Sequence, residues 1–205
     1  MNFTLTERLD DYIEYEGARY ALDLSFDNVL RVLELFGDTD FTKGQKAIIA
    51  FDMLVRDEIK VDIDTKAQII LFILKDFLDI DFDQLETSDA PKKPPVYDLK
   101  ADASYIYASF LQDYNIDLIE QQGKLHWKKF QALLTGLREK TKFREVVGIR
   151  TMDIPAPTEH NKEQRDHIMK LKEVYKLNIE EDQKTIEERV DATFNQVANF
   201  LRAGR

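Results

Sequence analysis

Cysteine is absent from the 205-residue sequence, which excludes a disulfide framework, a thiolate nucleophile and a zinc–thiolate site. Glycine is scarce, with seven residues, and neither phosphate-binding glycine pattern, GxGxxG or GxxxxGK[ST], occurs. Charged residues interrupt every apolar run before the roughly 18 residues that a membrane-spanning helix needs, and residues 1–10 lack a basic, apolar leader. We therefore expect neither a signal peptide nor a membrane span.

Positive charge is also in short supply. The 39 acidic residues exceed the 29 basic ones, for a net charge of −10, while 43% of the residues are hydrophobic, enough to build a packed core. Residues 1–100 contain 12 basic and 22 acidic side chains, whereas residues 101–205 contain 17 of each. Because nucleic-acid affinity depends on neutralising phosphates with Lys and Arg, this balance disfavours a nucleic-acid partner.

The N-terminal region combines a strand pattern with a helix pattern. Apolar residues alternate on the two sides of Gly17, which predicts a β-hairpin over residues 12–24 with Gly17 at its turn. The apolar spacing becomes helical over residues 26–36, with Ser25 or Asp27 as the N-cap. An isolated hairpin is marginal in water, so we expect it to pack against helices or a partner's strand.

The rest of the chain is expected to be helical. The expected helices cover residues 43–58, 64–78 (capped by Asp64), 101–114, 126–137, 139–150, 158–176 (capped by Thr158) and 179–202. The fold class is therefore α+β and predominantly α, with the hairpin packed on a multi-helix bundle and long charged C-terminal helices. We divide the chain into residues 1–85, a Pro-rich linker over 86–100, a second helical unit over 101–155, and charged helices over 156–205.

Histidine offers the first candidates for chemistry. His160, Glu163 and His167 would share one face of a helix, a spacing that can seat a transition metal. Charged residues surround this face, so we favour a solvated helix surface. His126 has no GxSxG or HExxH pattern near it, and we expect its half-covered ring to help start a helix. The prediction is no catalytic residue, no metal and no cofactor.

An acidic cluster near residue 80 offers a possible calcium site. Asp79, Asp81 and Asp83 fit the first ligands of an EF-hand, but Gln84 and Ala90 stand where that loop needs Gly and Glu. We therefore favour an amphipathic segment that closes the preceding helix.

Basic and aromatic residues interleave near residue 127, as they can in single-strand nucleic-acid binding. On a helix, Trp127 and Phe130 would point toward the core, and Lys128 and Lys129 largely away from it. We favour this core interpretation.

The last expected helix carries the 4-3-4 spacing of a coiled-coil seam, preceded by one further apolar residue. We call these apolar residues together the seam. It consists of Ile186, Val190, Phe194, Val197 and Leu201. It is the candidate partner-binding surface, although it can also pack within its own domain or pair with a second copy.

A series of motifs follows in fixed order after the linker. These are Tyr107-Ala-Ser-Phe110, Tyr114-Asn-Ile-Asp-Leu118, Leu125-His-Trp-Lys-Lys-Phe130, Leu133-Leu-Thr-Gly-Leu137, Thr141-Lys-Phe143 and Ile149-Arg150. With them, residues 10–150 resemble the bacteriophage gene-product-fifteen family, from tailed phages and prophages of Gram-positive bacteria. Asn115 stands where that family commonly has Gly, and Lys128 where it commonly has a second Trp.

The resemblance implies a function. Genes of this family typically lie between those for the major tail protein and the tape measure protein, a position like that of the tail assembly chaperones of long-tailed phages. It implies a non-enzymatic chaperone in the host cytoplasm that binds and solubilises the tape measure protein before the tail tube polymerises. The major tail protein and a second copy of the chain are further candidate partners. The alternatives are a structural, self-assembling tail protein and a small acidic inhibitor of a host protein.

Overall fold

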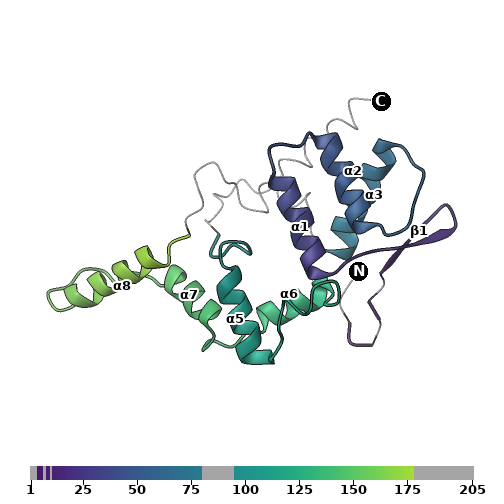
Figure 1. The fold of residues 1–205 in the computed structure, drawn as a ribbon. Coiled ribbons are helices and arrows are strands. Elements are labelled where there is room, and N and C mark those ends of the chain that lie inside the picture. The colour runs from purple at the N-terminus through teal and green to yellow at the C-terminus, as the bar shows by residue number, and fades with distance from the viewer. Residues whose placement is uncertain (1–3, 7, 10, 80–94, 178–205) are drawn as a thin grey trace. The chain divides into compact units, whose positions relative to one another are not determined.

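The structure, a computed structural model, describes residues 4–6, 8–9, 11–79 and 95–177 (Figure 1). The described chain forms two compact units. The first unit comprises the described residues up to 79 together with 122–131, and the second comprises 95–121 and 132–177. The chain thus returns to the first unit for one short segment before it completes the second.

The predicted hairpin is present in the first unit. Strand β1 (Tyr12–Tyr15) pairs antiparallel with β2 (Ala18–Ala21), so that Tyr15 faces Ala18 across a two-residue turn. Glu16 and Gly17 take φ values of 50° and 76°, and both values are positive, as a type I′ turn requires. The prediction of Gly17 as the turn residue is confirmed.

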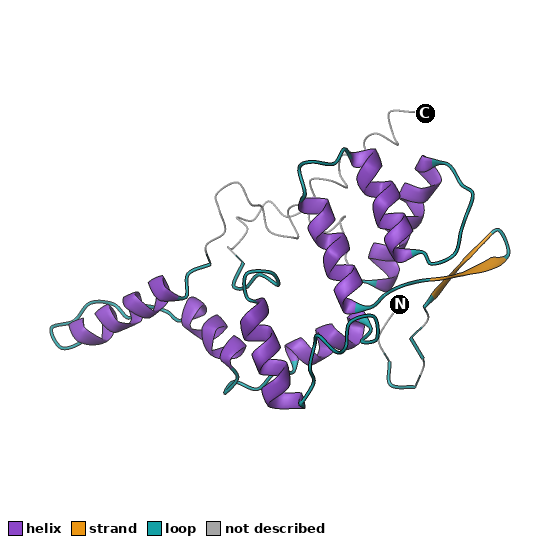
Figure 2. Ribbon diagram, in the orientation of Figure 1, coloured by secondary structure: helices purple, strands orange, loops and turns teal. Residues whose placement is uncertain are grey.

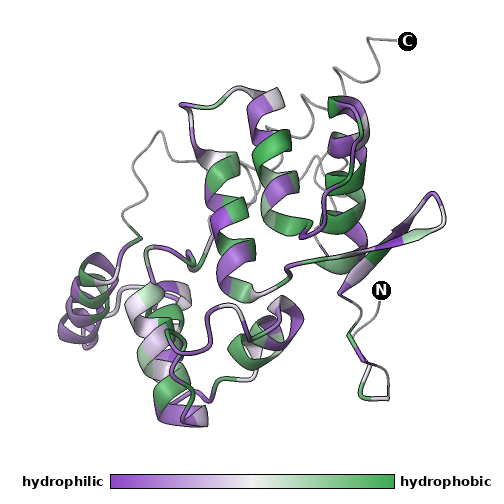
Figure 3. Cartoon of the chain, turned by 45° about the vertical axis from the view of Figure 1, so that its right-hand side comes forward, coloured by the Kyte–Doolittle hydropathy of each residue, from purple (hydrophilic) through white to green (hydrophobic). Residues whose placement is uncertain are grey.

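Helical segments follow the hairpin (Figure 2). They are α1 (Phe26–Gly37), α2 (Lys43–Leu54), α3 (Ile63–Phe72) and the π-helix η1 (Ile73–Phe77), which continues α3. Their fully buried side chains form the core of the first unit: Val29, Val32, Phe36, Leu54, Ile70, Ile73, Leu74 and Leu78. Hydrophobic and hydrophilic residues alternate along these helices, as amphipathic packing requires (Figure 3).

Several helix boundaries differ from the predicted ones, including two in the first unit. Ser25 is confirmed at the N-cap position of α1. The prediction of Asp64 as a cap was wrong, because the extended backbone of Asp62 places its carboxylate to accept from the Thr65 N–H at 2.7 Å. Helix α2 ends at Leu54 rather than residue 58, because Val55 turns extended and bridges to Leu22 beside the hairpin.

The second unit contains α5 (Ala103–Tyr114), most of whose neighbours come from α7 (Lys142–Thr151). Helix α8 (Lys162–Val174) lies against α7, and α6 (Trp127–Thr135) passes from the first unit into the second. The fold class predicted from the sequence, α+β with helix predominant, is confirmed. The expected helix over 179–202 lies outside the described residues.

The buried face of α5 is rotated from the predicted one. The apolar spacing predicts one side of the helix made of Ala103, Tyr107, Phe110, Leu111 and Tyr114. Phe110 is buried as predicted, but Ala103 and Leu111 are exposed, and Leu111 keeps 44% of its surface. Ile106 and Ser109 are buried in addition. The cause is a polar contact, since the Ser109 hydroxyl accepts from the Phe143 N–H of α7 at 3.0 Å.

Candidate functional site

The seam expected to bind a partner lies outside the described residues: Ile186, Val190, Phe194, Val197 and Leu201. The described chain therefore supplies other candidates. These are the histidines, the residues around Trp127, a buried ion pair in the second unit and the edge of the hairpin.

The three residues of the candidate histidine face do not all lie on one helix. Helix α8 begins at Lys162, after an N-cap position at Asn161, so His160 precedes the helix and the prediction of Thr158 as its cap was wrong. His160, Glu163 and His167 are all exposed. Within residues 4–79 and 95–177, as far as they are described, no three His, Asp or Glu side chains gather closely enough to hold a metal ion.

His126 starts α6, as predicted, but it is buried rather than half covered, with 9% of its surface exposed. Its Nδ1 accepts from the Lys128 N–H at 3.0 Å, and its carbonyl accepts from the Phe130 N–H at 3.0 Å. Its Nε2 lies 3.2 Å from the Asp11 carboxylate. Because Nδ1 accepts, the neutral ring carries its proton on Nε2 and donates it to Asp11.

Burial lowers the pKa of His126 below its ordinary value of 6.5. The Asp11 carboxylate opposes this shift, while the positive charges of Lys128 and Lys129 add to it. The lowered pKa keeps the ring neutral at pH 7, which is the form that can accept the Lys128 N–H. The surroundings of His126 therefore support a helix cap rather than a proton shuttle.

The aromatic residues beside His126 are in the core, as predicted. Trp127 and Phe130 are buried and stacked with centroids 5.7 Å apart, and Phe130 stacks on Phe26 at 5.0 Å. The prediction that Lys128 points away from the core was wrong. Lys128 is only 5% exposed, and its ammonium lies 3.0 Å from an Asp79 carboxylate oxygen. An aliphatic stem with a paired charge thus fills the position where the family commonly has Trp.

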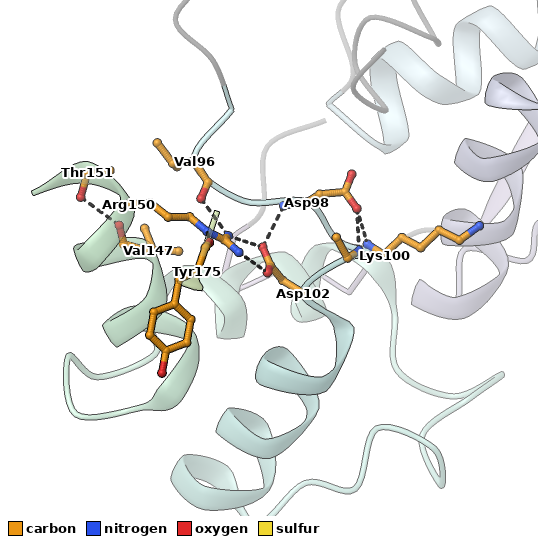
Figure 4. A network of polar contacts seen from close by, with 9 residues as sticks. Val96, Asp98, Lys100, Asp102, Val147, Arg150, Thr151 and Tyr175 are labelled. Carbon is orange, nitrogen blue, oxygen red and sulfur yellow. Dashed lines mark hydrogen bonds and ion pairs between the residues drawn. The ribbon is translucent and has the colours of Figure 1, made fainter. Parts of the chain in front are cut away.

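A buried ion pair organises the second unit (Figure 4). Asp102 and Arg150 meet in a bidentate pair, with Nη1 and Nη2 of Arg150 at 2.6 and 2.8 Å from the two carboxylate oxygens. Their side chains are only 1% and 11% exposed. Arg150 belongs to one of the sequence motifs described above, but no local pattern points to Asp102, which lies 48 positions away.

The remaining polar atoms of this pair are also engaged. Arg150 donates from Nε to the Tyr175 carbonyl at 2.6 Å and from Nη1 to the Val96 carbonyl at 3.2 Å. Asp102 also accepts from the Asp98 N–H at 3.0 Å. With its partners drawn from this same unit, the pair supports a structural clamp rather than a ligand site.

The hairpin, in contrast, has an open edge. The Leu22 N–H donates to the Asp11 carbonyl at 2.7 Å, so residues 11 and 22 form a hydrogen-bonded pair. Such pairs alternate along an antiparallel ladder, so the backbone N–H and C=O groups of Tyr12 and Glu14 point away from β2. We call these groups the β1 edge; they have no hydrogen-bond partner among the described residues.

The other edge of the hairpin is covered at Ala21. The Ala21 N–H donates to the Asp57 carboxylate at 2.6 Å, and the Ala21 carbonyl accepts from the Arg56 N–H at 2.8 Å. Side chains brace the sheet, since Arg19 lies 2.8 Å from Glu14 and 4.6 Å above the Tyr12 ring. Among the described residues, the outward groups of Ala21 on β2 are therefore occupied, whereas the β1 edge is open.

Comparison with known protein families gives a match. The sequence matches the family described as Bacteriophage Gp15 protein over residues 5–177. Searches of curated proteins and of solved structures give no match. In the part of the chain that the structure describes, no helix combines the length and apolar character needed to cross a bilayer. The match covers well over half of the sequence, and the chain therefore belongs to the bacteriophage Gp15 protein family.

Proposed function

We propose that the protein is a non-enzymatic tail assembly chaperone that holds the tape measure protein in solution before the tail tube polymerises. The observation that carries the proposal is family membership over residues 5–177, which makes the chain a phage protein. Gene order in the family, between the major tail protein and the tape measure protein, supports the more specific role. The major tail protein is a second candidate partner.

The physical need for such a chaperone follows from the tape measure protein itself. A long, largely helical chain with an apolar stripe self-associates unless something covers the stripe. The seam offers five apolar side chains at helical spacing, on a chain whose net charge is −10. When the seam covers the apolar stripe, tape measure chains cannot associate with one another through it. The net negative charge of the bound protein keeps the complex soluble.

The strength of each contact suits reversible binding. Burial of ~500 Å² of apolar area contributes about 12 kcal/mol gross, at about 25 cal/mol/Å². Ordering and association costs offset most of that, so a single copy binds weakly. Many copies along one tape measure protein would bind with avidity, and growing tube subunits would displace them one at a time.

Co-expression with the adjacent tape measure protein tests the proposal. We expect the tape measure protein to become soluble and to co-elute with several copies of this chain, as measured by size-exclusion chromatography with light scattering. The double variant Val190→Asp/Val197→Asp should abolish co-elution. Asn195→Asp/Asn199→Asp is the matched control, because it adds the same charges on the opposite side of the expected helix.

The outcomes separate the alternatives. If this chain elutes alone while the tape measure protein precipitates, the result contradicts the proposed chaperone function. A chain retained in purified virions supports a structural tail protein, since a chaperone leaves before the tail is complete. If the chain captures one host protein, and the Val190→Asp/Val197→Asp variant captures it equally well, the result favours the inhibitor of a host protein.

A further inference from the structure

We propose that the β1 edge is a docking site for an extended segment of a partner protein rich in Lys or Arg, which adds to the hairpin as a third strand. This inference is independent of the proposed chaperone function, because it rests on residues 11–21 rather than on the seam. The argument uses three features of the hairpin: its free backbone groups, its covered opposite side and its charge.

The outward backbone groups of the β1 edge, open among the described residues, give the affinity. Tyr12 and Glu14 each present one N–H and one C=O outward, at the spacing that an added antiparallel or parallel strand requires. The hairpin has two strands of four residues, a size that is marginal without further support. Ile13, which is 4% exposed, anchors β1 to the first unit, so an added strand would join a fixed template.

The covered opposite side gives direction. Arg56 and Asp57 occupy the outward groups of Ala21 on β2, with hydrogen bonds of 2.8 and 2.6 Å. Within the described residues, an incoming strand therefore meets occupied groups at Ala21 on β2 and open groups along the β1 edge. Figures 1, 2 and 3 show the hairpin projecting from the helices of the first unit.

The charge selects the occupant. From residue 9 to residue 18 the chain carries acidic residues and no Lys or Arg. Asp11 and Glu14 remain 58% and 61% exposed in their side chains, even though each contacts a basic neighbour. A second copy would bring an acidic strand against an acidic strand, which costs energy, whereas Lys or Arg at alternate positions meets opposite charge.

Peptide binding to the full chain tests the proposal. The probe is a fluorescent peptide in which Lys alternates with Val or Thr, and binding is measured by anisotropy at low ionic strength. We expect binding that weakens about tenfold or more when the backbone amides on one side of the peptide are N-methylated, since methylation removes donors and leaves the charge. A peptide with Glu in place of Lys should not bind.

A pair of variants separates the backbone from the side chain. Glu14→Pro removes an outward N–H that the hairpin ladder does not use, and Glu14→Ala removes the same carboxylate but keeps the N–H. Glu14→Pro should bind the Lys peptide about tenfold more weakly than Glu14→Ala. Slower hydrogen exchange at the Tyr12 and Glu14 amides of the unaltered chain, on addition of peptide, checks the same contact without any variant.

Three results would overturn the proposal. The first is no binding, or equal binding of the N-methylated peptide, which leaves charge attraction alone. The second is unchanged exchange at Tyr12 and Glu14. The third is a dimer of the chain that Glu14→Pro dissociates, which would make a second copy the occupant. Co-elution with the tape measure protein does not depend on these results, so the two proposals can fail separately.

Discussion

Asp102 and Arg150 join the beginning of one helix to the end of another through a bidentate ion pair that is almost free of solvent. Asp102 occupies the N-cap position of α5, where the helix dipole favours negative charge. Arg150 lies in the last turn of α7, where the dipole favours positive charge. The Lys172 ammonium adds a bond from α8 to the Arg150 carbonyl at 2.7 Å. This pair thus connects the three helices α5, α7 and α8.

Loss of either partner should therefore destabilise the second unit. Asp102→Ala leaves the Arg150 guanidinium buried without its carboxylate, and removal of one member of a buried pair costs about 3 kcal/mol of unfolding free energy. Urea denaturation followed by circular dichroism measures the loss. Glu145→Ala is the control, because its pair with Lys142 is exposed and should contribute about 1 kcal/mol or less. Equal effects of the two variants would contradict the structural role.

Ser109 should be needed for the start of α7. Its hydroxyl donates to the Tyr105 carbonyl at 2.7 Å and accepts from the Phe143 N–H at 3.0 Å, with no exposed surface. Ser109→Ala leaves that N–H buried without a partner, at a cost of about 1–3 kcal/mol. Ser104→Ala, an exposed change in the same helix, should leave the urea midpoint within error. If the urea midpoint of Ser109→Ala equals that of Ser104→Ala, water replaces the hydroxyl as the partner of the Phe143 N–H.

Asn115 ends α5 in the left-handed region, with φ 53° and ψ 35°. Glycine adopts this conformation without a Cβ penalty. Asn115→Gly should keep or slightly raise the thermal midpoint, whereas Asn115→Ala should cost about 1 kcal/mol. Gln112→Ala, at an exposed position of the same helix, controls for the change to Ala. Greater loss with Gly than with Ala would contradict this account.

Local pattern accounts for much of the fold. The alternation around Gly17 and the helical spacing of residues 26–36 specify the hairpin and α1, because each depends on near neighbours along the chain. Boundaries were less predictable where capping partners compete, as with Asp62 and Asp64, both of which can cap a helix. Apolar spacing alone could not choose between them.

Long-range polar contacts account for most of the errors. The face of α5 depends on Ser109, whose partner Phe143 is 34 residues away, and the burial of Lys128 depends on Asp79. Hydrophobic periodicity does not reveal such partners, because a prediction from apolar spacing places every polar residue on the solvent side. The direction of the Tyr12 and Glu14 backbone groups required the hairpin register, which the sequence analysis did not specify.

The buried ring of His126 should make stability fall in mildly acidic solution. Burial lowers the pKa of His126 in the folded chain below the ordinary value of 6.5 that it regains on unfolding. Between those two values the unfolded chain binds more protons than the folded chain, so the unfolding free energy rises with pH. The contribution is complete above about pH 6.5 and is lost as the pH falls toward the folded pKa.

Substitution of His126 should remove this pH dependence. His126→Asn keeps an acceptor at the N-cap position of α6 and carries no titrating ring, so its unfolding free energy should be nearly constant between about pH 5 and 7. Urea denaturation at a series of pH values measures the slope for each protein. His167→Asn, at an exposed position of α8, should keep the slope of the unaltered chain. If His126→Asn also keeps that slope, the proton responsible is bound elsewhere, and the cap formed by the His126 ring is not what acid disrupts.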